Sequence, residues 1–555
     1  MFCFQCEQTK EGVGCDVEGL CGKKFDVAAG HDVLIYALKG IAMWAHRARK
    51  MGVIDSEADR IVTRAIFATL TNVNFDYDDI IDYCKKAISA REKIKEMYID
   101  ACKKAGKEPE ELSGAAVFAL PEEDDDLYDL AKSIGIVQSM KTLGKDVCGV
   151  QEMIVYGVKG LAAYADHAFI LGIEDDAVYA GIHEILDFLT TEEAKSLDNL
   201  LPMALKAGEL NMKIMEMLDK QEVERFGNPE ITQVSLVSRI GKAILISGHD
   251  LHFLEELLKQ TDGTGIDIYT HGEMLPAHAY PGLKKYSHLV GHYGGAWQKQ
   301  KTEFSKFPGP IVMTSNCIIE PRRSYMASIY TMGPVSYPGC PHLDSTEFSD
   351  VIETAKSMLG FKEEKKIGNG DLEKLLIGFA FNSVMSVAGD VIEAVKSGKI
   401  KKFFLIGGCD GPERKRSYFT TLAEKLPEDH VILTLGCGKY RVNHKDYGVI
   451  PGTGIPRLLD CGQCNDAFSA IKIAVALKDA FGLASVNDLP LEFAISWFEQ
   501  KAVAILLTLL HLGIKGIHLG PNLPAFVTPA VLDVLVKEFE IAPVTNIKDD
   551  FGIEN

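Results

Sequence analysis

The chain lacks a hydrophobic run long enough to cross a membrane. Its longest strongly apolar stretch, Val503–Ile514, is shorter than the roughly 20 residues that a transmembrane helix needs. A secretory signal peptide is also missing, because four cysteines stand where its charged and apolar regions would lie. We therefore expect a cytoplasmic protein with no membrane partner.

An excess of positive charge is missing as well. The 555 residues include 59 Lys and Arg against 78 Asp and Glu, so the formal net charge is -19 at pH 7. A nucleic-acid phosphate backbone would be repelled by such a chain, and we expect no nucleic-acid partner. Neither a repeat at solenoid period nor a nicotinamide or flavin fingerprint stands out.

What is present is a dense group of cysteines at the N-terminus. Cys3, Cys6, Cys15 and Cys21 follow the spacing C-x2-C-x8-C-x5-C, with glycines between them that allow sharp turns. Four thiolates bind either zinc or an iron–sulfur cluster. Zinc ribbons usually contain two C-x2-C pairs, and here only Cys3 and Cys6 form one. The spacing favours iron–sulfur over zinc. Disulfides are disfavoured further, because the other cysteines are scattered through apolar segments.

Apolar spacing predicts helices over the first ~220 residues. Ser56 and Asp59 resemble a capping box before one of them, and a polar break is expected at Gly106–Asp126. Other helices are predicted at Asp78–Lys104, Leu127–Lys141, Gly149–Leu171, Asp175–Leu189 and Thr191–Lys220. This pattern is typical of two helix bundles joined by a loop.

The pattern changes near residue 230, where buried strands alternate with helices. Strand-like runs occur at Ala243–Gly248, Gly265–Tyr269, Pro310–Thr314, Phe403–Gly407, Val431–Leu435 and Gly516–Leu519. The alternation predicts α/β domains with largely parallel sheets. We thus expect a multidomain α + α/β protein: a helical domain at 1–225, an α/β domain at 226–360 and another at 361–555.

Residues with metal-binding side chains follow several of these strands. Cys317, Cys409 and Cys437 each come after a strand, as do His249 and Glu273, and Cys464 lies in a second C-x2-C. Ligands bind beyond the carboxyl ends of parallel strands, so these side chains could share one crevice. Each cysteine taken alone is more simply a buried core residue. Together they favour a second metal centre.

Several motifs resemble the hybrid cluster protein, or prismane, family over essentially the whole chain. Besides the N-terminal cysteines, they are GHD at 248–250, HGEM at 271–274, TSNC at 314–317, GGCDG at 407–411, GCGK at 436–439, GQCND at 462–466 and SWFEQKAV at 496–503. The length and the long helical N-terminal region resemble family members with two helical bundles before the α/β domains.

The resemblance implies two cofactors and their ligands. Cys3, Cys6, Cys15 and Cys21 match the ligands of a cubane 4Fe–4S cluster. A hybrid 4Fe–2O–2S cluster at the domain interface would take His249, Glu273, Cys317, Cys409, Cys437, Cys464 and Glu499. Cys409 matches a cysteine that carries a persulfide, and Lys501 matches a lysine beside that cluster. From the sequence alone, Glu499 and Lys501 look like the exposed end of a helix, and Lys439, Tyr440 and Arg441 like surface or packing residues.

The family resemblance also implies an activity. The family is associated with the reduction of hydroxylamine to ammonia and water. The resemblance makes His249, Glu273, Glu499 and Lys501 the candidate catalytic residues, and it implies a separate protein as electron donor. Nitric oxide reduction in nitrosative-stress defence is an alternative. So are a non-catalytic electron carrier or redox sensor, and a relative of the nickel-containing carbon monoxide dehydrogenases.

Overall fold

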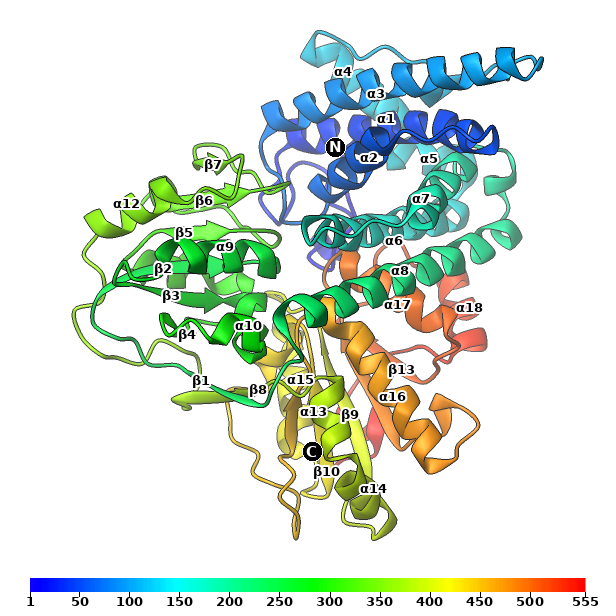
Figure 1. Cartoon of the computed structure of the whole chain (residues 1–555). Coiled ribbons are helices and arrows are strands. Elements are labelled where there is room, and N and C mark those ends of the chain that lie inside the picture. Colours follow the sequence, from blue (N-terminus) through cyan, green and yellow to red (C-terminus); the bar gives the residue numbers. More distant parts are fainter. Residues whose placement is uncertain (555) are drawn as a thin grey trace.

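The computed structural model describes residues 1–554, so Asn555, the last residue of the predicted third domain, lies outside the described part. A group of helices comes first in the chain, a first β-sheet follows, and a second β-sheet comes last (Figure 1). The helical N-terminal region and the two largely parallel sheets confirm the predicted fold class. The division of the chain at residues 225 and 360 stays a prediction.

The N-terminal region consists of helices joined by short loops. They are α1 (Phe25–Lys50), α2 (Ser56–Ala68), α3 (Tyr77–Lys104), α4 (Asp124–Ile134), α5 (Ile136–Leu143), α6 (Lys145–Ile170), α7 (Asp176–Phe188) and α8 (Leu197–Phe226). Helix α1 packs against α3, α4 and α7, and α6 packs against α8. The helix predicted over Leu127–Lys141 is two helices, because the chain leaves the helical conformation at Gly135.

Aspartate side chains cap the N-termini of three of these helices. Asp55 accepts a hydrogen bond from the Glu57 N–H, and Asp76 and Asp175 cap α3 and α7 in the same way. The predicted capping box of Ser56 and Asp59 is therefore wrong, because the N-cap is Asp55, one residue earlier. Asp59 is instead buried inside the bundle.

The first sheet has eight strands in the order β7-β6-β5-β2-β3-β4-β1-β8. Their bounds are β1 (Thr232–Ser235), β2 (Lys242–Ser247), β3 (Ile266–His271), β4 (Leu289–His292), β5 (Ile311–Met313), β6 (Ile329–Met332), β7 (His342–Leu343) and β8 (Lys374–Ile377). All neighbours are parallel except β1 and β8. Helices α9 (Leu251–Thr261), α10 (Pro281–Lys284), α11 (Gln300–Glu303) and α12 (Ser349–Ser357) accompany this sheet.

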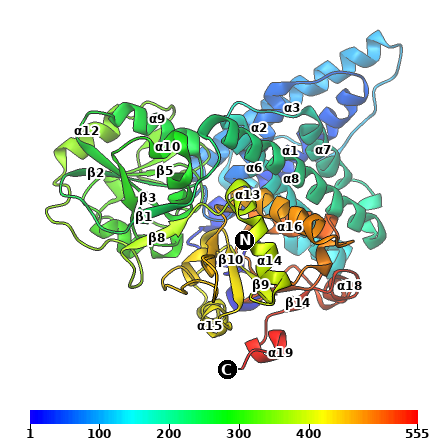
Figure 2. The same ribbon diagram turned by 60° about the horizontal axis from the view of Figure 1, so that its bottom comes forward.

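The second sheet is parallel throughout, in the order β11-β10-β9-β12-β13-β14. Its strands are β9 (Lys402–Gly408), β10 (His430–Thr434), β11 (Leu458–Asp460), β12 (Leu491–Ser496), β13 (Ile517–Gly520) and β14 (Ala542–Pro543). The helices of this part are α13 (Phe381–Ser386), α14 (Ala388–Lys396), α15 (Ser417–Lys425), α16 (Ala467–Phe481), α17 (Gln500–His511), α18 (Pro529–Phe539) and α19 (Ile547–Phe551). The two sheets lie beside each other rather than face to face (Figures 1 and 2).

Helix α17 connects the second sheet to the N-terminal bundle, because it packs along α6 and α8. Glycines make this contact close. A Cβ atom on Gly160 of α6 would lie 2.5 Å from the Gln500 carbonyl oxygen, and one on Gly208 of α8 would lie 2.1 Å from the Leu507 carbonyl oxygen. The start of α17 is thereby pressed against α6.

Among residues 1–554, the helices that are long enough to cross a bilayer are all too polar to do so.

Candidate metal centres

Seven predicted ligands stand directly beyond the carboxyl ends of seven parallel strands. His249 follows β2, Glu273 follows β3, Cys317 follows β5, Cys409 follows β9, Cys437 follows β10, Cys464 follows β11 and Glu499 follows β12. In each sheet the strands concerned are neighbours: β5, β2 and β3 in the first, and β11, β10, β9 and β12 in the second. The structure brings all seven residues to the edges where the two sheets meet, and they line one cavity of about 30 Å³.

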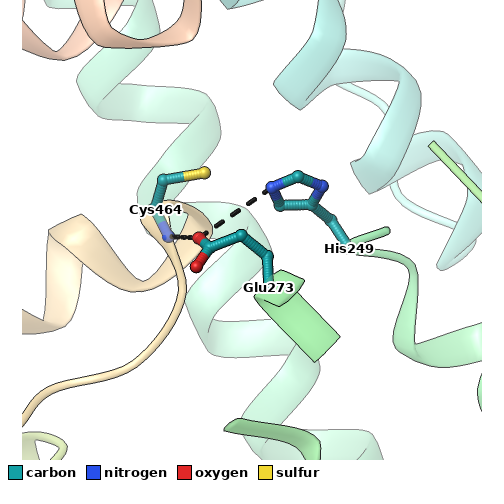
Figure 3. A group of neighbouring side chains, drawn as sticks. All are labelled: His249, Glu273 and Cys464. Carbon is teal, nitrogen blue, oxygen red and sulfur yellow. Dashed lines mark hydrogen bonds and ion pairs between the residues drawn. The ribbon is translucent and has the colours of Figure 1, made fainter. Parts of the chain in front are cut away.

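Glu273 joins the two edges (Figure 3). Its Oε2 atom accepts a hydrogen bond of 2.8 Å from the Cys464 N–H and lies 3.9 Å from Nε2 of His249. One ligand-type atom from each of these three buried residues lies within 4.8 Å of the others. The second carboxylate oxygen, Oε1, is buried without a hydrogen-bond partner. This oxygen is therefore available as a ligand for a cation.

Glu499 and Lys501 lie in the interior, so the interpretation as an exposed helix end is wrong. The two residues are only 2% and 0% exposed. Glu499 is the N-cap of α17: its Oε2 accepts from the Lys501 N–H at 2.9 Å, and its Oε1 lies 3.9 Å from the Cys409 sulfur. The cap holds the carboxylate over the cavity while the helix lies against the N-terminal bundle.

Burial strongly disfavours charge on these ligands. It raises the pKa of Cys409 and Cys437 well above the usual thiol value, and that of Cys464 to about 12. Burial also raises the pKa of the Glu273 and Glu499 carboxyls. Metal ligands must be deprotonated thiolates and carboxylates, and a bound cation supplies the compensating charge. The chemistry of this donor set therefore fits a metal group that takes both soft sulfur and hard oxygen ligands.

Buried lysines provide a second test of fit. Four lysines are buried in the described part of the chain: Lys23, Lys159, Lys439 and Lys501. Lys439 is fully buried and forms an ion pair of 2.7 Å with Asp460, so of its two expected places, surface or packing, the surface one is wrong. No carboxylate oxygen of the described residues lies within 4.0 Å of the other three. Buried charges are normally paired, and each of these three lysines lies near predicted cluster cysteines. An anionic cluster at each place would supply the missing charge.

The four N-terminal cysteines are folded together by their own loop. Cys3 and Cys15 form a small antiparallel bridge, with N–H···O distances of 3.0 and 2.8 Å. Burial, followed by the charges of Cys21 and Cys3, raises the pKa of the Cys6 thiol well above its usual value. Within residues 1–554, no three of these sulfurs lie within 4.8 Å of one another. Ligands of a single zinc ion would lie closer, since each Zn–S bond is only ~2.3 Å. The wider spacing suits a polynuclear cluster.

The N-terminal loop touches the segment that carries Glu499. The Glu7 N–H donates to the Phe498 carbonyl at 2.9 Å, and the Gln500 side-chain amide donates to the Gln5 carbonyl at 2.6 Å. Gln5 and Glu7 flank Cys6, and Phe498 and Gln500 flank Glu499. The two predicted centres are thus connected through adjacent pieces of backbone.

Three contacts around the cavity were not predicted from the sequence. Asn316 donates from Nδ2 to the Cys317 sulfur at 3.5 Å, and Lys439 also donates to the Gly462 carbonyl at 2.8 Å. Tyr164 of α6 is fully buried, and the Lys501 ammonium lies 5.8 Å from the centre of its ring. The helical pattern around Tyr164 marks only a core position, so no signal in the sequence separates it from other buried aromatic residues.

Comparison with known proteins places this geometry in a family. The family model described as Prismane/CO dehydrogenase family matches residues 1–552. A hydroxylamine reductase of Methanocella arvoryzae is 51% identical over 550 residues, which cover 99% of each chain. One of Acidithiobacillus ferrooxidans is 50% identical over 545 residues, covering 98% of this chain and 96% of the relative.

A solved structure shares the fold at low sequence identity. It is a chain from a structure of acetyl-CoA synthase/carbon monoxide dehydrogenase, with a TM-score of 0.54 and 14% identity, and the match covers 99% of this chain and 86% of that one. At that identity the likeness concerns the fold alone. The full-length family match and the close relatives decide the assignment: the chain belongs to the Prismane/CO dehydrogenase family.

Proposed function

We propose that this protein is an iron–sulfur oxidoreductase that reduces hydroxylamine to ammonia and water. The observation that carries the proposal is the mixed set of buried Cys, Glu and His side chains gathered from two sheet edges around one cavity. A shielded electron carrier needs only sulfur ligands. Oxygen and nitrogen ligands are useful where an iron site must open to a small molecule. The naming of close relatives as hydroxylamine reductases supports the same activity.

The site residues would hold a hybrid 4Fe–2O–2S cluster. Its ligands would be His249, Glu273, Cys317, Cys409, Cys437, Cys464 and Glu499, with Cys409 the candidate for a persulfide. When bound, such a group supplies electrons and a Lewis-acidic coordination position. Cys3, Cys6, Cys15 and Cys21 would hold a 4Fe–4S cluster that passes electrons from a separate donor protein.

The chain's own residues supply charge and protons. Reduction of hydroxylamine adds two electrons and two protons and breaks the N–O bond, so the leaving oxygen gains negative charge. Burial works to lower the pKa of Lys501, but Cys464, Glu499 and Cys317 raise it above its usual value. Lys501 therefore stays an ammonium beside the cavity, where it would stabilise the developing oxyanion and donate a proton.

The test is anaerobic turnover with an artificial electron donor. Fully iron-loaded protein, reduced by a viologen dye, should oxidise the dye faster when hydroxylamine is added and should form one ammonia for each two dye electrons. If hydroxylamine does not accelerate dye oxidation, the carrier or sensor function replaces the reductase.

Nitric oxide is a second candidate substrate, and one observation favours it. An apolar cavity of about 350 Å³ lies between the second sheet and helices α16 and α17, and Cys409 and Cys464 form part of its wall. A cavity lined by Leu, Ile, Ala and Val suits a small uncharged gas better than a polar amine. Consumption of nitric oxide far more efficiently than hydroxylamine would keep the reductase but change its substrate.

A narrowing variant separates the two substrates. Ala470 and Ala474 line the apolar cavity, and Ala474→Trp should obstruct it. We expect that variant to slow nitric oxide consumption several-fold and to leave hydroxylamine turnover within twofold. Equal effects on both substrates would count against a separate gas route.

A further inference from the structure

Lys159 is a buried lysine that forms no ion pair with any carboxylate in the described part of the chain. It lies on α6 and is 5% exposed. Its ammonium donates to Oε1 of Gln5 at 2.9 Å and to the Thr69 carbonyl at 3.4 Å, both of which are neutral acceptors. Gln5 stands between Cys3 and Cys6, so Lys159 reaches the N-terminal loop between two predicted ligands.

The surroundings of Lys159 contain charges of both signs. Lys23 of the N-terminal loop adds a second buried ammonium, which contacts Nδ1 of His31 at 2.9 Å. Asp32 of α1 and Glu152 of α6 line the same cavity of about 80 Å³. In the described part of the chain, neither carboxylate comes within 4.0 Å of Lys159, so neither forms an ion pair with it.

Two neighbouring ammonium groups in an interior are costly without an anion. Burial, together with the charge of Lys23, lowers the pKa of Lys159 to about 8. The negative charges of Cys3, Glu152 and Asp32 act in the opposite direction and raise the pKa of Lys159, with Cys3 the strongest of the three. Lys159 therefore lies where negative charge on the cysteine loop stabilises its ammonium, while Asp32 and Glu152 act from beyond ion-pair distance.

We propose that Lys159 is the counter-charge of the N-terminal cluster and raises its reduction potential. The inference rests on the proposed function, which places a 4Fe–4S cluster on Cys3, Cys6, Cys15 and Cys21. Reduction adds one electron to a group that already carries net negative charge through its thiolates. A nearby fixed cation stabilises the reduced form more than the oxidised form. Lys159 would thus help this cluster to accept electrons from a donor. Lys159 would act only through its charge on the cluster and would not contact the substrate.

The experiment compares potentials of the whole protein with both clusters in place. We would follow the electron paramagnetic resonance of the N-terminal cluster in an anaerobic redox titration of wild type, Lys159→Met and Lys159→Arg. At a fixed potential, Lys159→Met should lower the ratio of reduced to oxidised cluster about tenfold, which equals ~59 mV for a one-electron couple. Lys159→Arg keeps the charge and should restore most of the ratio.

Lys501→Met is the matched control at the other centre. It removes a second unpaired buried ammonium, and it should leave the potential of the N-terminal cluster unchanged. Lys159→Gln covers the case in which Lys159→Met loses its cluster, because glutamine keeps a hydrogen-bond donor while it removes the charge.

The results separate the possible failures. An unchanged potential in Lys159→Met or Lys159→Gln, with an intact cluster signal, would overturn the inference. Equal shifts in the Arg and Met variants would also overturn it, because they would point to packing rather than charge. Absence of any four-iron signal from the wild type would instead refute the proposed function.

Discussion

Lys501 is fully buried and its ammonium has no hydrogen-bond partner among the described residues. Lys439 is equally buried but is paired with Asp460. Two buried lysines near the same cavity thus have different surroundings. In one the charge is neutralised by the fold, and in the other it is left for whatever binds in the cavity.

The first prediction uses this contrast. Lys501→Met should lower hydroxylamine turnover by about 10²-fold, the usual loss when one stabilising donor is removed, while iron content and the free energy of unfolding stay near those of the wild type. Lys439→Met should instead lower the free energy of unfolding by about 3 kcal/mol, because it leaves Asp460 buried and unpaired. Turnover, iron analysis and denaturant unfolding of both variants check this. Unchanged turnover in Lys501→Met would remove the lysine from the mechanism.

At the scale of elements, the site depends on how α17 is seated. Its N-terminus carries Glu499 and Lys501, and Gly160 of α6 allows the two helices to approach closely. A Cβ atom at position 160 would lie 2.6 Å from that of Ala504 and 2.9 Å from the Lys501 Cα. A methyl group there must push α17 away.

The second prediction is that Gly160→Ala impairs the site from a distance. We expect at least a tenfold loss of turnover and an altered resonance of the hybrid centre, with the N-terminal centre retained. Gly389→Ala in α14 is the matched control, because a Cβ atom there meets nothing within 4 Å. Equal behaviour of the two alanine variants would mean that the helix contact does not position the site.

The third prediction concerns the helical bundle. Asp59 of α2 accepts hydrogen bonds from Arg49 at 2.5 Å and from His183 at 2.8 Å, which joins α2 to α1 and α7. Burial alone would raise the pKa of Asp59, but His183 and Arg49 hold it below its ordinary value. Its stabilising contribution is therefore full above the unfolded pKa of about 3.9 and is lost as the pH falls through the lower folded pKa.

Asp59→Asn tests this directly. We expect a loss of about 3 kcal/mol at neutral pH, constant down to about pH 5 and smaller below pH 4. Denaturant unfolding of wild type and variant at matched pH measures the difference. A difference that grows on acidification would contradict the assignment.

These strands and helices also show which parts of the site can be predicted from the sequence. Strands β2, β5, β9 and β10 are mostly apolar, and β3 carries Ile and Tyr around a single aspartate. The ligands that follow these strands are predictable from the rule for parallel sheets. Strand β12 is not predicted, because Glu492 follows its first residue and leaves an apolar run of only three residues, Phe493–Ile495. Without it, Glu499 has no strand end to stand beyond, and burial of Lys501 depends on α6, over 300 residues away. Only the family resemblance identified these two residues in advance.

For the whole molecule, the arrangement separates two tasks. The N-terminal loop would hold an electron relay near the surface, and the two sheet edges would hold the reaction site in the interior. Backbone contacts from Gln5 and Glu7 to residues beside Glu499 connect them.

The fourth prediction is that the tasks can be separated. Cys6→Ala should remove the signal of the N-terminal cluster and slow electron delivery at least tenfold, while the resonance of the hybrid centre stays recognisable. Glu499→Ala should change the hybrid signal and leave the N-terminal signal intact. If each folded variant loses both signals, the two centres are not independent.

The most direct test of the central claim is metal and acid-labile sulfide analysis of anaerobically purified protein, combined with electron paramagnetic resonance. Two sheet edges that offer sulfur, oxygen and nitrogen ligands, beside a loop that offers only sulfur, predict two distinct iron resonances. They also predict fewer sulfide ions than iron atoms, because oxygen bridges would replace part of the sulfide in the proposed hybrid centre. Zinc or nickel should be absent at stoichiometric level. Protein that contains zinc without iron, or iron with a single cluster signal, would contradict the account.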